Sequence, residues 1–233
     1  LAGRRRQTLA RIAADEGLLV LEDDPYGKLR YRGVDLPPVK HWDEVGQVIY
    51  ASTFSKTIAP GLRLGWVVAP AEIGEQLLLL KQSADLHTST LNQRVAHAFL
   101  TGNDQTVHLG RIRQAYGERF AIMDAALRAE MPAGFSWTHP EGGMFLWITG
   151  PAQLDGLALL ERAIERKVAF VPGRDFFPTD AGANYLRLNY SNSTPERIRE
   201  GGAPAGGAVP RRVKGGATEA SDPTRRRFSG PFP

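Results

Sequence analysis

Chemically versatile side chains occur in three sets within residues 23–63. A carboxylate and a phenol form the first set, two hydroxyls and a lysine form the second, and an arginine forms the third. These residues are Asp23 and Tyr26, then Thr53, Ser55 and Lys56, then Arg63. If they converge, one crevice contains groups that exchange protons and groups that bind anions.

Short apolar runs explain how these sets come together. Residues 18–21, 47–51 and 64–69 read as strands of a parallel sheet that is buried on both faces. Open α/β sheets bind ligands beyond the carboxyl ends of their strands. The pair Pro60-Gly61 between Lys56 and Arg63 predicts a turn that lets the backbone approach a ligand closely.

Each of these residues also has an ordinary structural interpretation. An aspartate after a strand often caps a turn, a tyrosine can simply pack, and Lys56 and Arg63 could be solvated charges. The acidic triplet Glu22–Asp24 could bind a divalent cation, but no further cluster of Asp, Glu or His stands at ligand spacing. The residue types alone leave these alternatives open.

The remaining pattern mixes helices and strands. Helical spacing is evident over 4–17, 71–86, 90–101, 104–130 and 154–166, and further strands are expected near 135–138, 143–148, 168–171 and 184–190. We therefore expect an α/β fold, with α+β as the alternative. The long helix near 104–130 is a natural connector between two domains.

Five blocks, taken together, resemble one known family. They are Glu22-Asp-Asp-Pro-Tyr26, Thr53-Phe-Ser-Lys-Thr-Ile-Ala-Pro-Gly-Leu-Arg-Leu-Gly65, His139-Pro-Glu-Gly-Gly-Met-Phe-Leu-Trp147, Val168-Ala-Phe-Val-Pro-Gly-Arg-Asp-Phe-Phe177 and Leu186-Arg-Leu-Asn-Tyr-Ser191. In this order they resemble the class I/II aminotransferases, fold type I enzymes that use pyridoxal 5′-phosphate (PLP). The subgroup they resemble comprises 2-aminoadipate and kynurenine aminotransferases and the aminotransferase domain of MocR-type regulators.

The resemblance implies a role for each site residue. Lys56 is expected to form a Schiff base with PLP and then to act as the general base. Asp23 is expected to pair with the pyridine nitrogen, and Tyr26 to donate a hydrogen bond to the ring O3′. The phosphate ligands would be Thr53, Ser55 and Arg63, while Arg187 would bind the substrate α-carboxylate. Gly142 and Gly143 are expected to allow close backbone packing near the site.

The implied function is transfer of an amino group between an L-amino acid and a 2-oxo acid in the cytoplasm, by a protein that is a homodimer when full-length. The alternative is the PLP-binding effector domain of a MocR-type regulator, the one case in which nucleic acid is a partner. A PLP lyase or decarboxylase on the same fold stays open. No membrane partner is expected, because no apolar run approaches about 18 residues.

The same resemblance implies a domain division. Residues 1–103 would be the C-terminal part of a large PLP-binding domain with a mainly parallel sheet, and 104–200 the connecting helix and a small α+β domain. The family's N-terminal half would be missing, so we expect an N-terminally truncated fragment that binds PLP weakly or folds poorly on its own.

Composition separates residues 201–233 from the rest of the chain. The 233 residues carry 29 basic and 25 acidic side chains, of which six and two lie in 201–233, leaving 23 of each elsewhere. The net charge of +4 therefore belongs to a Gly- and Pro-rich tail, predicted to be low-complexity and either disordered or frame-shifted. The absence of cysteine excludes a disulfide scaffold, a thiolate metal site and a cysteine nucleophile.

Overall fold

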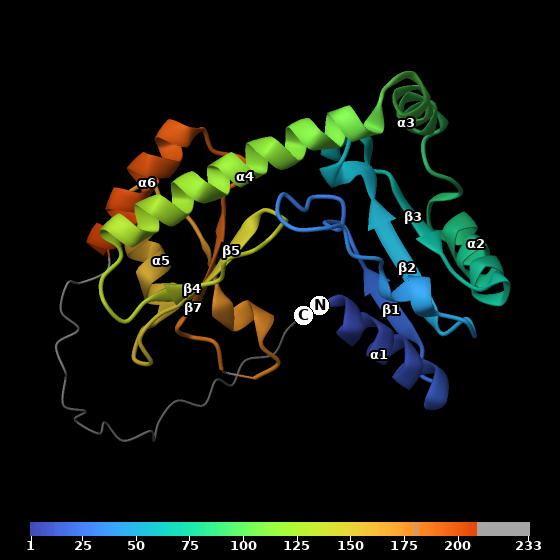
Figure 1. The fold of residues 1–233 in the computed structure, drawn as a ribbon, viewed down its shortest axis with the longest axis horizontal. Coiled ribbons are helices and arrows are strands. Elements are labelled where there is room, and N and C mark those ends of the chain that lie inside the picture. The colour runs from blue at the N-terminus through green and yellow to red at the C-terminus, as the bar shows by residue number, and fades with distance from the viewer. Residues whose placement is uncertain (180, 209–233) are drawn as a thin grey trace, which may run out of the picture.

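The chain folds around two separate sheets that a long helix connects. The computed structural model describes residues 1–179 and 181–208, so most of the predicted tail lies outside the described residues. Figure 1 shows the two sheets on opposite sides of an arch, with helix α4 (Gln105–Glu130) running across the top from one to the other. This arrangement is the α/β architecture expected of part of a fold type I enzyme.

The first sheet carries the predicted site residues at one end. Its order is β1 (Val20–Asp23), β2 (Val48–Thr53) and β3 (Gly65–Val68). Strands β1 and β2 are parallel, but β3 runs antiparallel to β2. The sheet is therefore mixed rather than mainly parallel, and the reversal brings the start of β3 beside the end of β2. Gly65 pairs with Thr53 there.

The strands of this sheet are much less buried than their apolar sequences predicted. Helix α1 (Gly3–Asp15) packs near the 3-10 helix Val39–Trp42, and Ala10, Val39 and Val48 form a small buried cluster. The expectation of strands buried on both faces is wrong for the described chain. Along β1, side chains alternate between half-buried and exposed, and all four residues of β3 are exposed.

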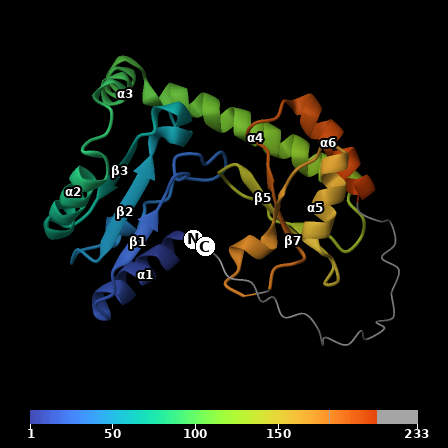
Figure 2. The same cartoon turned by 180° about the vertical axis from the view of Figure 1, so that it is seen from behind.

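Helices α2 (Ala71–Asp85) and α3 (Thr90–Gly102) lead from the first sheet into α4 (Figure 2). Capping side chains start two of these helices, as their sequences suggest. Ser89 accepts a hydrogen bond from the backbone of Asn92, and Asp104 accepts bonds from Thr106 and Val107. Helix α4 then buries Phe120 and Leu127 against the second sheet, which fixes its far half.

The second sheet is antiparallel and holds the main core. Its order is β4 (Ser136–Trp137), β5 (Phe145–Thr149), β7 (Tyr185–Asn189) and β6 (Val171–Pro172). Helix α5 (Gly156–Glu165) begins at the cap Asp155. The fully buried side chains come from α4, the two central strands and the segments around them, and include Leu29, Phe120, Leu146, Ile148 and Tyr190.

The last helix continues further than its sequence suggests. Helix α6 (Pro195–Ala208) packs along α4, and its helical backbone extends through residues 201–208, the start of the segment predicted to be low-complexity. Small residues with little β-branching do not prevent a helix that is already nucleated and packed. Within residues 1–179 and 181–208, no helix has both the length and the apolar character that crossing a membrane requires.

Candidate active site

The acidic triplet after β1 divides into three different environments. Glu22 points toward the 3-10 helix Val39–Trp42 and accepts bonds from two of its backbone N–H groups. Asp24 accepts a 3.0 Å hydrogen bond from the Tyr50 hydroxyl, and burial together with this carboxylate raises the pKa of Tyr50 to about 12. Asp23 is exposed, and its carboxylate makes no hydrogen bond or ion pair with any described residue. It is therefore the carboxylate of the triplet that is free to meet a ligand.

This division also explains why the triplet does not form a metal site. Two of its three carboxylates already accept hydrogen bonds from other parts of the fold. Across the described part of the chain, no group of three or more His, Cys, Asp or Glu side chains could hold a metal ion.

Hydroxyl groups gather where β2 ends. Thr53 caps the short 3-10 helix Phe54–Lys56: its Oγ1 accepts a 3.0 Å bond from the Ser55 backbone N–H and lies 2.9 Å from Ser55 Oγ. The same hydroxyl donates to the Leu64 carbonyl at 2.7 Å. These bonds tie the end of β2 to the start of β3 and fix the two hydroxyls side by side.

Arg63 joins this hydroxyl pair because of its backbone conformation. It lies just after the 3-10 helix Pro60–Leu62, with φ of 50° and ψ of 42°, in the left-handed region. This conformation costs a non-glycine residue roughly 1–2 kcal/mol. The guanidinium Nη1 donates to the Pro60 carbonyl at 3.2 Å and lies 3.5 Å from Ser55 Oγ. Two hydroxyls and a guanidinium thus form a cradle suited to an anion.

Lys56 stands at the end of the same short helix. Its amine makes no hydrogen bond or ion pair with a described residue. The backbone immediately after it is held from α4, because His108 Nε2 lies 2.7 Å from the Thr57 carbonyl and the His108 ring packs edge-on against Phe99. Nothing in the spacing of the sequence pointed to His108, which is distant in the chain.

Arg187 lies on the second sheet, between two aromatic rings. Its guanidinium carbon is 4.4 Å from the centre of the Phe145 ring and 4.6 Å from that of Phe176. Its Nε is buried and has no hydrogen-bond partner. Cation–π contacts of this kind contribute about 0.5–2 kcal/mol each. A half-buried cation that contacts ring faces and has an unpaired Nε is prepared to accept an anion.

Phe145 connects this arginine to the first sheet. Its ring packs edge-on against Tyr26, with ring centres 5.8 Å apart. The two units approach closely here because Gly142 lies on the backbone of Leu29 and Arg30: a Cβ at Gly142 would fall 2.8 Å from the Arg30 Cα. The expected close packing is confirmed for Gly142. Gly143 instead serves a left-handed turn, with φ of 81° and open space around it.

The predicted residues therefore form two groups, one around the end of β2 and one along a series of aromatic contacts. Asp23 pairs with Ala51 across the parallel strands, so it lies near the β2 end that carries Thr53 and Lys56. Tyr26 extends from the loop after β1 to Phe145, and Phe145 contacts Arg187. The sequence did not single out the aromatic partners of Arg187, although Phe145 lies in the block His139–Trp147 and Phe176 in the block Val168–Phe177.

A lysine, a carboxylate, two hydroxyls and an arginine thus lie around the end of β2, on a fold type I scaffold. The chain belongs to the family Aminotransferase class I and II, which matches residues 5–201. It is 43% identical over 198 residues to aromatic-amino-acid aminotransferase 1 of Thermococcus litoralis, covering 85% of this chain and 48% of that protein.

Two further comparisons bear on function. The solved alpha-aminoadipate aminotransferase of Thermus thermophilus, in complex with N-(5′-phosphopyridoxyl)-L-leucine, aligns with a TM-score of 0.83 and 39% identity over 87% of this chain and 53% of that one. An HTH-type transcriptional regulator of Bacillus subtilis is 30% identical, covering 86% of this chain and 41% of the regulator. The chain spans about half the length of these relatives.

Proposed function

We propose that this chain provides the lysine-bearing half of a PLP-dependent aminotransferase, which moves an amino group between an L-amino acid and a 2-oxo acid. The observation that carries the proposal is that the end of the β1–β2 pair brings together an unpaired Lys56 amine, an unpaired Asp23 carboxylate and the Thr53–Ser55–Arg63 cradle. Family membership gives this combination its chemical meaning.

The residues present fit the cofactor. The cradle formed by Thr53, Ser55 and Arg63 presents two hydroxyls and a cation, which match a phosphate group. Asp23 is an exposed carboxylate without a partner, as a group that must pair with a ring N–H⁺ should be. Tyr26 supplies a phenol on the side of the second sheet. When bound, PLP supplies an electron sink for the bond being broken at the substrate Cα.

Lys56 has two tasks in this proposal. Its amine would hold the cofactor before the substrate arrives, and would then serve as the general base for the proton at the substrate Cα. Both tasks require the neutral form of the amine, whereas a carboxylate paired with it would favour the charged ammonium form. The absence of an ion-pair partner for Lys56 among the described residues supports this role.

Arg187 orients the substrate. Its guanidinium would bind the substrate α-carboxylate through two parallel hydrogen bonds, while Phe145 and Phe176 keep the guanidinium plane fixed. The buried Nε–H of Arg187, which has no hydrogen-bond partner in the structure, would donate to this carboxylate. Positioning of this kind places the Cα–H where Lys56 can reach it.

The proposal includes the domain division and the assembly. Residues 1–103 contribute to a large PLP-binding domain, 104–200 form the connecting helix and small domain, and 201–233 are the basic low-complexity tail, whose first residues continue α6 to Ala208. The complete protein acts as a homodimer in the cytoplasm, on an L-amino acid and a 2-oxo acid. Which amino acid and which oxo acid bind depends on side chains other than the one that contacts the α-carboxylate.

Borohydride trapping tests the role of Lys56. The purified chain is mixed with PLP, reduced with borohydride, digested and mapped by mass spectrometry. We expect the phosphopyridoxyl mass on Lys56, and we expect it to disappear in Lys56→Ala but not in Lys81→Ala, whose lysine pairs with Asp85 on exposed α2. Labelling that is spread over several lysines, with no preference for Lys56, would contradict the proposal.

A second function has one observation in its favour. The similarity to HTH-type regulators extends over 86% of this chain, so a PLP-binding effector domain would use the same residues. Conversion of PLP to pyridoxamine phosphate by amino acids in the full-length protein separates the two. Turnover indicates a transaminase, binding without turnover indicates an effector domain, and loss of CO₂ or a side-chain fragment indicates a lyase or decarboxylase.

A further inference from the structure

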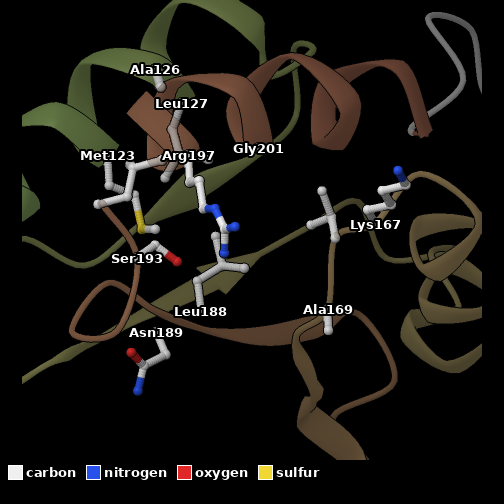
Figure 3. Close-up of a pocket in the computed structure, with 12 residues that line it drawn as sticks. Met123, Ala126, Leu127, Lys167, Ala169, Leu188, Asn189, Ser193, Arg197 and Gly201 are labelled. Atoms are coloured by element: carbon white, nitrogen blue, oxygen red, sulfur yellow. The ribbon is translucent and has the colours of Figure 1, made fainter. Parts of the chain in front are cut away.

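A cavity of about 140 Å³ lies in the second unit, away from Lys56 and Arg63. It opens between α4, α6, the segment after α5 and the end of β7, as Figure 3 shows. A water molecule takes up about 30 Å³ of liquid, so the cavity has room for a small organic molecule rather than a single water. None of the residues assigned to the proposed transamination lines it.

The lining of this cavity is divided between apolar and cationic groups. Met123 and Leu127 of α4, Leu188 of β7 and Ile198 of α6 form apolar walls. Arg197 and Lys167, both exposed, supply two positive charges, and Asn189 and Ser193 add neutral polar groups. No acidic side chain lines this cavity, although Glu200 joins the two cations around an adjoining pocket. A ligand that satisfies both parts must have an apolar body and an anionic end.

Arg197 has no partner among the described side chains. Its backbone N–H bonds to Thr194, but its guanidinium makes no hydrogen bond or ion pair with a described residue. Arg199, two residues later on α6, faces Glu196 at 3.9 Å. In Figure 3 the Arg197 side chain extends from α6 among the lining residues, toward Leu188. The free guanidinium is thus directed into the cavity.

Lys167 contributes from the opposite element. It follows α5 in a left-handed conformation with φ of 60°, and its backbone N–H bonds to the Ile164 carbonyl. This turn makes Lys167 part of the cavity lining, together with Val168 and Ala169. The two cations therefore come from separate elements and surround one space.

We propose that this cavity is a binding site for a small monocarboxylate with an apolar chain of about six carbons. The carboxylate meets Arg197, with Lys167 adding to the positive field, and the chain lies on Met123, Leu127 and Leu188. Inorganic phosphate would leave the apolar walls uncovered, and a neutral alkane would leave Arg197 unpaired. The site is independent of PLP.

Strand β7 connects this site to Arg187. Leu188 lines the cavity, and the preceding residue Arg187 points to the other face of the strand, between Phe145 and Phe176. The apolar chain of a ligand in the cavity would therefore contact the strand that holds the proposed substrate anchor. The proposed site is placed to influence that anchor through a single peptide unit.

Methionine methyl NMR tests the proposal directly. The chain contains three methionines, of which Met123 lines the cavity while Met131 and Met144 do not. With ¹³C-methyl methionine in the whole chain, and no PLP, hexanoate should shift the Met123 signal in a saturable way. The Met131 and Met144 signals should stay in place, and hexanamide, which has no charge, should produce a much weaker effect.

Variants of α6 assign the anion contact. Arg197→Gln should weaken hexanoate binding roughly tenfold, and Arg197→Lys should retain part of it. The matched control Arg199→Gln removes an arginine that does not line the cavity and should leave binding unchanged. The proposal is overturned if Met123 does not respond, if all three methionines shift together, if hexanamide equals hexanoate, or if Arg197→Gln binds as the unmodified chain does.

Discussion

Arg187 illustrates how a single residue acquires its chemistry from its neighbours. Two ring faces remove much of its water, and its buried Nε has no acceptor. Desolvation without a hydrogen bond is unfavourable, so an anion that pairs with this guanidinium recovers that free energy. The aromatic residues thus hold the arginine ready for a carboxylate.

Removal of one ring should change the environment of Arg187. In Phe176→Leu, we expect the Arg187 Nε–Hε signal in ¹⁵N NMR to move downfield, because one ring current is lost. Phe177→Leu is the control: Phe177 packs on Trp147 and Tyr185 and has no cation–π contact with Arg187. An unchanged Arg187 signal in Phe176→Leu would show that the ring does not cover the guanidinium in solution.

At the scale of elements, the loop after β1 contacts the second unit through backbone hydrogen bonds. The Tyr31 and Arg32 N–H groups bond to the Glu141 carbonyl at 3.0 and 3.1 Å, and the Gly143 N–H bonds to the Leu29 carbonyl at 3.1 Å. The Tyr31 hydroxyl lies 2.8 Å from that of the buried Tyr190. Close backbone approach of this kind depends on the missing side chain of Gly142.

Gly142→Ala should therefore be destabilising. The added methyl would meet Leu29 O and Arg30 Cα, both backbone atoms, at 2.8 Å. We expect a loss of about 1–3 kcal/mol in the free energy of unfolding, measured by urea denaturation. Gly61→Ala, where a Cβ meets nothing within 4 Å, should change it by less than about 0.5 kcal/mol. Equal effects of the two substitutions would contradict the packing argument.

The entry to β2 depends on the carboxylate of Asp43. Its oxygens accept bonds from the backbone of Gly46, Gln47 and Val48 and from the Lys40 ammonium, at 2.8–3.0 Å. Burial alone would raise the pKa of Asp43, but the Lys40 ammonium and the backbone N–H groups outweigh it and lower the pKa to about 2. The folded state therefore favours the ionised form.

The sign of the pH dependence follows from this lowered pKa. Asp43 stabilises the fold above the ordinary aspartate pKa, and this contribution, up to about 2 kcal/mol, is lost as pH falls toward about 2. Asp43→Asn should be less stable than the unmodified chain at pH 7, and the difference should shrink on acidification. Urea denaturation across this range measures it. Asp85→Asn, at an exposed pair with Lys81, should show almost no difference at any pH.

For the whole molecule, the first unit is distinguished by its uncovered apolar surface. Trp66, Val67 and Val68 of β3 are 40–50% exposed, and Leu21 of β1 is 68% exposed. Leucines 77–80 of α2 are exposed as well. So many exposed apolar side chains in one unit suggest that other polypeptide normally covers them.

We expect this surface to be detectable in solution. The purified chain should bind the dye ANS and associate in sedimentation velocity experiments. Addition of a separate polypeptide equivalent to the unmatched half of a relative should reduce both. Val67→Lys should weaken association, whereas Leu157→Lys, at an exposed position of α5 on the second unit, should not. A monodisperse monomer without dye binding would contradict this expectation.

The sequence by itself determined the residue types, their order and the family, because Lys56, Arg63 and Arg187 lie in blocks whose spacing is local. It also located most helices and strands, since their periodicity and caps are local as well. Only the tertiary structure decided which carboxylate of Glu22–Asp24 is free, that β3 runs antiparallel, and that Phe145 and Phe176 enclose Arg187. These features depend on contacts between segments far apart in the chain, and no local pattern encodes which partners meet there.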